Sequence, residues 1–113
     1  MTRAEIKKGY PLDWDTIATT VKVAHGRKCE ACGHVDSPAT NYTLTVHHLL
    51  PIPSLCEPWN LAALCQRCHL TVQNTFDIRQ EPMFELPVWL KPHRAGFVAW
   101  KDQQERRGRE ALS

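Results

Sequence analysis

The chain has 113 residues, the size of one ordinary domain, with 23% charged and 42% apolar residues. Its net charge of +2 and pI near 8.3 permit nucleic-acid binding. They exclude the class of strongly basic nucleic-acid-binding proteins, whose pI is usually above about 9. It has no apolar run near the roughly 18 residues of a membrane span. The first residues lack the apolar stretch of a signal peptide, so we expect a cytoplasmic protein without membrane contact.

The N-terminal part predicts an irregular arm over residues 1–12, followed by a helix over residues 14–25. Asp13 suits the N-cap position, and Gly26 suits a helix end. Apolar residues at steps of three and four give this helix one apolar face, formed by Trp14, Ile17, Ala18, Val21 and Ala24.

The central part predicts two short strands and a helix. Residues 42–50 are rich in β-branched and aromatic types and alternate in polarity up to Val46, as in a strand. The three prolines of residues 51–58 exclude regular structure there. The apolar run 60–64 predicts a second strand pairing back on the first, and residues 66–76 have helical spacing.

The C-terminal part predicts a last helix that begins near Pro92 and frays through a charged tail. We therefore expect one α+β domain over residues 1–113 with its core at about 29–76. The segment 1–28 supplies an N-terminal arm and helix, and 77–113 supplies a C-terminal extension and helix.

Two Cys-x-x-Cys pairs dominate the chemistry of the sequence: Cys29 with Cys32, and Cys65 with Cys68. A two-residue gap lets both sulfurs face one ion, and four thiolates close a tetrahedron around zinc. We predict a structural Zn²⁺ on these four residues. Reduced or redox-active thiols and a rubredoxin-like iron site are the alternatives. The lone Cys56, in the proline-rich loop, is interpreted as a half-buried small residue.

Between and after these pairs stand His47-His48, Asn60 and His69, separated by 11 and 8 residues. With the cysteine pairs in place, this arrangement resembles the HNH endonuclease motif, in the zinc-ribbon branch with four cysteines. The resemblance covers roughly residues 29–75. It implies a ββα-metal fold, in which two antiparallel strands and a helix hold one divalent ion.

The resemblance also implies roles for individual residues. His47 and His69 would bind the catalytic ion, His48 would be the general base, and Asn60 would pin the loop that orients the base. Adjacent strand residues point to opposite sides, so we expect the histidine pair at a distorted strand end. An imidazole with a pKa near neutrality can take a proton from water at physiological pH.

One position departs from the family pattern. Some relatives supply a third ligand four residues after the helix histidine, where this chain has Gln73. Two imidazoles without a carboxylate favour Mn²⁺, Ni²⁺, Co²⁺ or Zn²⁺ over Mg²⁺ as the catalytic ion.

The main hypothesis is therefore a metal-dependent endonuclease that acts on DNA, expected to be double-stranded, and leaves 5′-phosphate and 3′-hydroxyl ends. A monomer would nick one strand at a time, and a weak homodimer could cut both. The alternatives are a non-catalytic zinc-ribbon module that binds nucleic acid or protein, and an iron–thiolate redox protein.

Outside the motif, His25, His34 and His93 are interpreted as surface or capping residues, and the four tryptophans as core residues. Any DNA contact would rely on local groups of basic residues. The candidates are Lys7, Lys8, Arg27, Lys28, Arg67, Lys91, Arg94, Arg106, Arg107 and Arg109.

Overall fold

The computed structural model describes residues 10–82 and 85–112, and within them it has three α-helices and a two-stranded antiparallel sheet. The chain is therefore a small α+β protein. The elements follow in the order α2 (Trp14–Ala24), β1 (Leu44–His48), η1 (Pro58–Asn60), β2 (Leu61–Cys65), α3 (Gln66–Thr75), η2 (Val88–Leu90) and α4 (Lys91–Leu112). None of the described helices is both long and apolar enough to cross a membrane.

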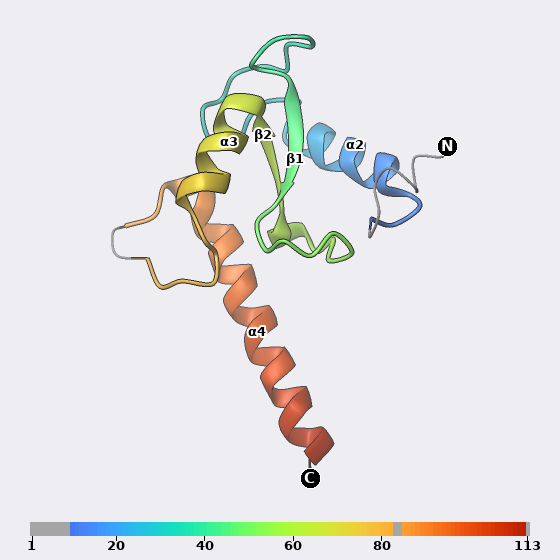
Figure 1. The fold of residues 1–113 in the computed structure, drawn as a ribbon, viewed down its shortest axis with the longest axis vertical. Helices are drawn as coiled ribbons and strands as arrows, with labels where there is room; N and C mark the ends of the chain where they lie inside the picture. Colours follow the sequence, from blue (N-terminus) through green and yellow to red (C-terminus); the bar gives the residue numbers. More distant parts are fainter. Residues whose placement is uncertain (1–9, 83–84, 113) are drawn as a thin grey trace.

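The sheet lies between α3 and α2 (Figure 1). Strands β1 and β2 pair without a break from Leu44 opposite Cys65 to His48 opposite Leu61. All five residues of β2 are buried, because helices cover both faces of the sheet. A two-stranded sheet is marginal in water alone, so this covering is what stabilises it.

The two strands begin and end at particular hydrogen bonds. The predicted strand 42–50 is shortened at its start, where the Thr43 amide bonds back to the carbonyl of Thr40 in a turn. At its end, the side-chain oxygen of Asn60 accepts the Leu50 amide and draws the chain into the loop. A local backbone turn therefore sets the start of β1, and the side chain of the distant Asn60 sets its end.

The first helix ends close to its predicted limit, while its start differs in detail. Gly26 has a φ of +64° and donates its amide to the carbonyl of Val23, which closes the helix. Asp13 occupies the N-cap position, but its side chain makes no capping hydrogen bond. The predicted arm lies outside the described residues as far as residue 9.

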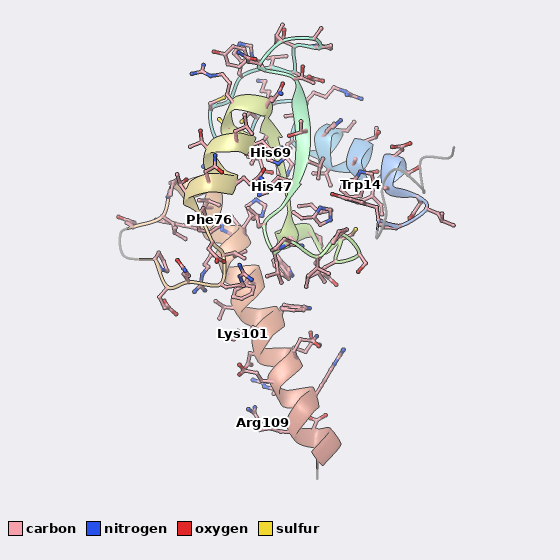
Figure 2. All side chains as sticks on the ribbon, in the orientation of Figure 1. Trp14, His47, His69, Phe76, Lys101 and Arg109 are labelled. Atoms are coloured by element: carbon pink, nitrogen blue, oxygen red, sulfur yellow. The ribbon has the colours of Figure 1, made fainter. Side chains whose placement is uncertain are left out.

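The first half of the last helix packs against the rest of the molecule, and its second half extends into solvent. It begins at Lys91 and packs on η1 and η2, while residues 101–110 are all exposed. Figure 1 shows this outer half extending away from the other elements, and Figure 2 shows Lys101 and Arg109 on it.

The prediction that His93 is a surface or capping residue is wrong, because this side chain is buried inside the molecule. Its Nδ1 lies 2.7 Å from the Trp59 carbonyl oxygen, and its Nε2 lies 2.7 Å from a carboxylate oxygen of Glu30. Both partners are acceptors, so both ring nitrogens carry protons and the ring is an imidazolium. The pair ties α4 to the turn that contains the first two cysteines.

Gly96 sits where α4 meets Trp59. A methyl group there would overlap the Trp59 Cβ and lie 2.6 Å from its Cγ, whereas one on Gly108 would meet nothing within 4 Å. We expect Gly96→Ala to lower the free energy of unfolding by about 2 kcal/mol. The matched Gly108→Ala should be neutral or stabilising by up to about 1 kcal/mol. Urea unfolding of both variants tests the packing of α4, and equal effects would contradict it.

The buried imidazolium predicts a pH dependence of stability. Burial lowers the pKa of His93, but the hydrogen bond and charge of Glu30 and the Trp59 carbonyl outweigh burial, so the pKa is raised. A raised pKa stabilises the fold fully below about pH 6.5, and this contribution fades as the pH passes the folded-state value. His93→Ala should cost about 3 kcal/mol near pH 6 and less at higher pH.

The control for this prediction is His25→Ala, which removes an exposed imidazole 3.4 Å from the same carboxylate. Its effect should stay below about 1 kcal/mol. Denaturant unfolding between pH 6 and 9 measures both variants. A cost of His93→Ala that grows with pH would refute the imidazolium assignment.

Candidate metal centre and histidine site

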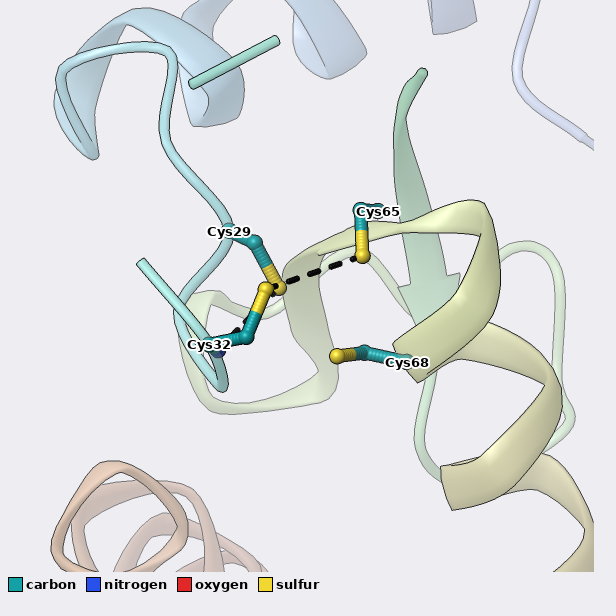
Figure 3. Close-up of side chains that lie close together, drawn as sticks. All are labelled: Cys29, Cys32, Cys65 and Cys68. Carbon is teal, nitrogen blue, oxygen red and sulfur yellow. Dashed lines mark hydrogen bonds between the residues drawn. The ribbon is translucent and has the colours of Figure 1, made fainter. Parts of the chain in front are cut away.

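Four cysteine sulfurs meet between the turn at residues 29–33 and the junction of β2 with α3 (Figure 3). The ligand atoms of Cys29, Cys32, Cys65 and Cys68 all lie within 4.8 Å of one another, and all four cysteines are free thiols. This group could hold a metal ion such as zinc, as the spacing predicts. Among the described residues it is the only group of three or more His, Cys, Asp or Glu placed around one point.

Local backbone geometry creates each half of this centre. In the first half, the amide of Gly33 bonds to the Cys29 carbonyl, and its φ of +78° suits a residue without a side chain. In the second half, Cys65 ends β2 and Cys68 lies in the first turn of α3, which brings both sulfurs to one side.

The first half is also fixed to the sheet. The Glu30 amide donates to the Ala63 carbonyl over 2.8 Å, and the Glu30 carboxylate accepts the Ala63 amide over 2.6 Å. The cysteine turn therefore extends the pairing of β2 on the side away from β1.

The surroundings of the cysteine thiols shift their pKa values in opposite directions. Burial raises the pKa of Cys29, but backbone hydrogen bonds at Cys65, Cys32 and Ala31 outweigh it and bring the pKa to about 7. Burial and the neighbouring sulfurs raise the pKa of Cys68. The Cys29 thiolate forms easily and its charge opposes ionisation of Cys68, so a bound cation would favour the thiolate form of Cys68.

Two predicted ligands of a second ion, His47 and His69, also meet. Their ring centroids are 4.5 Å apart between β1 and α3 (Figure 2). Burial, with smaller contributions from His69 and His48, lowers the pKa of His47 to about 4, and burial lowers that of His69. Both rings are therefore neutral at physiological pH, the state in which imidazole binds metals.

His48 turns to the other face of the sheet, as its neighbouring position on a strand requires. It stacks on Trp14 of α2 with centroids 5.0 Å apart and meets Tyr10 edge-on at 5.3 Å. The expected distorted strand end is absent, because regular pairing continues through His48. Burial lowers the pKa of His48, and a hydrogen bond to the Pro53 carbonyl opposes this.

One ring nitrogen of His48 is left without a partner. Its Nε2 is buried and makes no hydrogen bond within the described residues. This nitrogen is therefore shielded both from protein donors and from bulk water.

Asn60 is fully buried, with 0% of its surface exposed. Its Oδ1 accepts the Leu50 amide over 2.6 Å, and its Nδ2 donates to the carbonyls of Leu50 and Leu55 over 3.1 and 2.9 Å. These bonds fold the proline-rich loop back onto the end of β1. Asn60 thus fixes the loop that contains Pro53, and Pro53 lines the same hollow as His48.

His47 and His48 share a hollow although their rings face different neighbours. A cavity of about 300 Å³ is lined by both, together with His69, Gln73 and Tyr10. A second cavity of about 200 Å³ also touches both histidines and Gln73 and continues to Asp77 and Arg79.

Sequence reasoning missed Arg79 and Asp77. Arg79 binds both carboxylate oxygens of Asp77 over 2.9 and 3.0 Å. Both residues line the second cavity, so the guanidinium lies at the edge of the histidine hollow. The pair follows α3 by only a few residues, but no spacing rule connects it to His47.

The structure places Arg67 on a different face of α3 from His69. Its guanidinium donates to the Tyr42 hydroxyl over 2.7 Å, and His34 stacks on the same tyrosine ring at 3.7 Å. These three residues line a cavity of about 490 Å³ beside the cysteines. Lys7 and Lys8 lie outside the described residues.

The donor set at the histidine hollow fits a weakly held ion. His47 and His69 supply two neutral nitrogens, and the amide of Gln73 lines the same hollow. Within the described part of the chain, no Cys, Asp or Glu joins the two histidines to make a third strong ligand. Water and substrate oxygens would have to complete the coordination.

Comparisons of the chain with protein-family models, with curated proteins and with solved structures give no match.

The cysteine centre predicts tight zinc binding that stabilises the fold. Cys68→Ser should lose the bound ion and lower the thermal midpoint by at least about 10 °C, the result of a loss of about 2 kcal/mol. Cys56→Ser is the matched control, since Cys56 lies outside the group and its thiol bonds to the Pro53 carbonyl. Elemental metal content and thermal unfolding with and without EDTA measure both. A wild-type protein free of metal and insensitive to EDTA would contradict the assignment.

Proposed function

We propose that this chain is a metal-dependent DNA endonuclease of the HNH type. The observation that carries the proposal is the meeting of His47 and His69 at 4.5 Å across β1 and α3, with His48 next in the strand and lining the same hollow. The element order β1–β2–α3, joined to a four-cysteine group, is the order of the ββα-metal fold that the motif implies.

The proposed ion site uses the two neutral rings. A divalent ion bound there would polarise the scissile phosphate and stabilise the leaving 3′ oxygen. The chain's own contribution is to hold His47 on β1 and His69 on α3 at a fixed separation. Cys65 and Cys68 stand on either side of the junction between β2 and α3, so an ion bound to the cysteine group would also fix that separation.

The proposed general base is His48. The ring lines the hollow that His47 and His69 share. Its Nε2 is buried and makes no hydrogen bond among the described residues, so it would take a proton from the attacking water once substrate binding opens access to it. Stacking on Trp14 keeps the ring from rotating. Asn60 acts one step further away, since it fixes the loop that presents Pro53.

The proposed substrate is DNA, expected to be double-stranded. The electrostatic attraction would be modest, because the net charge is only +2 and several arginines are already paired with carboxylates. Arg79 at the edge of the histidine hollow is the cation best placed to meet a phosphate, provided that the phosphate displaces Asp77. The expected activity is nicking of one strand per active site.

A plasmid-nicking assay tests the proposal. Zinc-loaded protein is incubated with supercoiled plasmid and Mn²⁺, Ni²⁺, Co²⁺, Mg²⁺ or Zn²⁺ in turn. Wild-type protein should nick with Mn²⁺, Ni²⁺ or Co²⁺, because nitrogen ligands favour these ions over Mg²⁺. His48→Ala should nick at least about 100-fold more slowly, since it lacks the base.

His34→Ala is the matched control. It removes an exposed imidazole that lines the cavity at the other face of α3, and it should retain the wild-type rate. Purification of all three proteins side by side excludes a contaminating nuclease. Full activity in His48→Ala, or strong activity with Mg²⁺ and none with Mn²⁺ or Ni²⁺, would count against the proposed site.

A second candidate is a non-catalytic zinc-ribbon module that binds nucleic acid. The stack of His34, Tyr42 and Arg67 over a large cavity favours it, because aromatic and guanidinium groups bind bases and phosphates. Zinc-loaded wild-type protein that binds DNA but nicks no plasmid with any ion would support this candidate over the nuclease.

A further inference from the structure

We infer that Thr45 is a positioning residue for the ion site: its hydroxyl fixes His69 in the tautomer that leaves Nε2 free to bind metal. This inference rests on the proposed function for the identity of the site. It goes beyond that function by assigning a role to a residue that is neither ligand nor base.

The Thr45 side chain has a single hydroxyl proton. Its Oγ1 lies 2.7 Å from the carbonyl oxygen of Leu64, which can only accept a hydrogen bond. The hydroxyl proton must therefore lie between these two oxygens. The bond spans β1 and β2, because Thr45 and Leu64 are direct partners in the sheet.

The same oxygen lies 3.0 Å from Nδ1 of His69. Since the only proton of Thr45 is already used, Oγ1 can act toward His69 only as an acceptor. Nδ1 must then supply a proton. In a neutral imidazole the other nitrogen, Nε2, is consequently the one with the free lone pair.

The position of Thr45 explains why this lone pair belongs to the proposed site. Thr45 and His47 are two residues apart on β1, so they point to the same face of the sheet, the face that α3 covers. One strand thus supplies both a ligand and the group that orients the other ligand on α3. The chain Leu64–Thr45–His69 runs from the backbone of β2 to the helix.

Outer hydrogen bonds of this kind tune metal binding by about 10- to 100-fold. Without the hydroxyl, His69 can adopt the other tautomer, in which Nε2 carries a proton, or rotate away from His47. A substitution that deletes the hydroxyl and preserves shape should therefore weaken metal binding while the fold survives.

The experiment compares Thr45→Val with Thr45→Ser. Valine preserves shape and strand preference but lacks the hydroxyl, whereas serine keeps the hydroxyl. Thr71→Val is the control on α3, where the hydroxyl bonds to the Arg67 carbonyl at the exposed surface. Zinc-loaded proteins, with the cysteine group filled, are titrated with Ni²⁺ by calorimetry.

Thr45→Val should bind Ni²⁺ about 10- to 100-fold more weakly than wild type. Thr45→Ser and Thr71→Val should stay within about threefold. Wild-type affinity in Thr45→Val, or equal losses in the serine and valine variants, would overturn the inference.

A second measurement does not depend on whether the Thr45 variants fold, because it uses wild-type protein. Long-range ¹H–¹⁵N correlation spectra of wild-type protein, without added Ni²⁺, report the tautomer of His69, identified by its absence in His69→Ala. The Nδ1–H tautomer is expected, and the Nε2–H tautomer would overturn the inference. Neither readout uses DNA cleavage, so a failure of the nuclease proposal is seen separately in the plasmid assay.

Discussion

The junction at which β2 becomes α3 is the constraint on which the remaining structure depends. Cys65 ends the strand and Cys68 opens the helix, and their sulfurs meet those of the turn at residues 29–33. A two-stranded sheet has little stability of its own. A metal ion shared by four sulfurs would fix the helix against the sheet and the preceding turn against both.

This junction also determines where the histidines stand. Since α3 follows β2 directly and packs on the sheet, His69 lies over β1, where His47 and Thr45 share one face. On the other face, α2 brings Trp14 against His48, and Asn60 holds the loop that contacts the same ring. Different residues therefore support the site and supply its proposed chemistry. The four cysteines and the amide of Asn60 fix the geometry, and the imidazoles of His47, His48 and His69 supply the nitrogen atoms.

Much of this could be predicted from local patterns. Helical periodicity placed the first helix to within a residue of its end, and the Cys-x-x-Cys spacing indicated the cysteine group, because both signals arise within a few neighbouring residues. The missed features depend on partners far apart in the sequence. His93 belongs to no motif in the sequence, and only the fold shows that it contacts Glu30, 63 positions away. Arg79 is equally invisible to spacing rules. The face of His48 follows from strand alternation, and the error was to expect a distorted strand end there. The proposed chemistry rests on the motif and on the geometry of the histidines.

We propose that the molecule holds two different ions, one on sulfur and one on imidazole nitrogen. Anomalous diffraction from crystals of zinc-loaded protein soaked in Mn²⁺ tests it directly, since each metal is identified at its own absorption edge. We expect zinc among the four cysteines and manganese between the rings of His47 and His69. Zinc in the cysteine group with no second metal at the two histidines, or those rings turned away from each other, would contradict it.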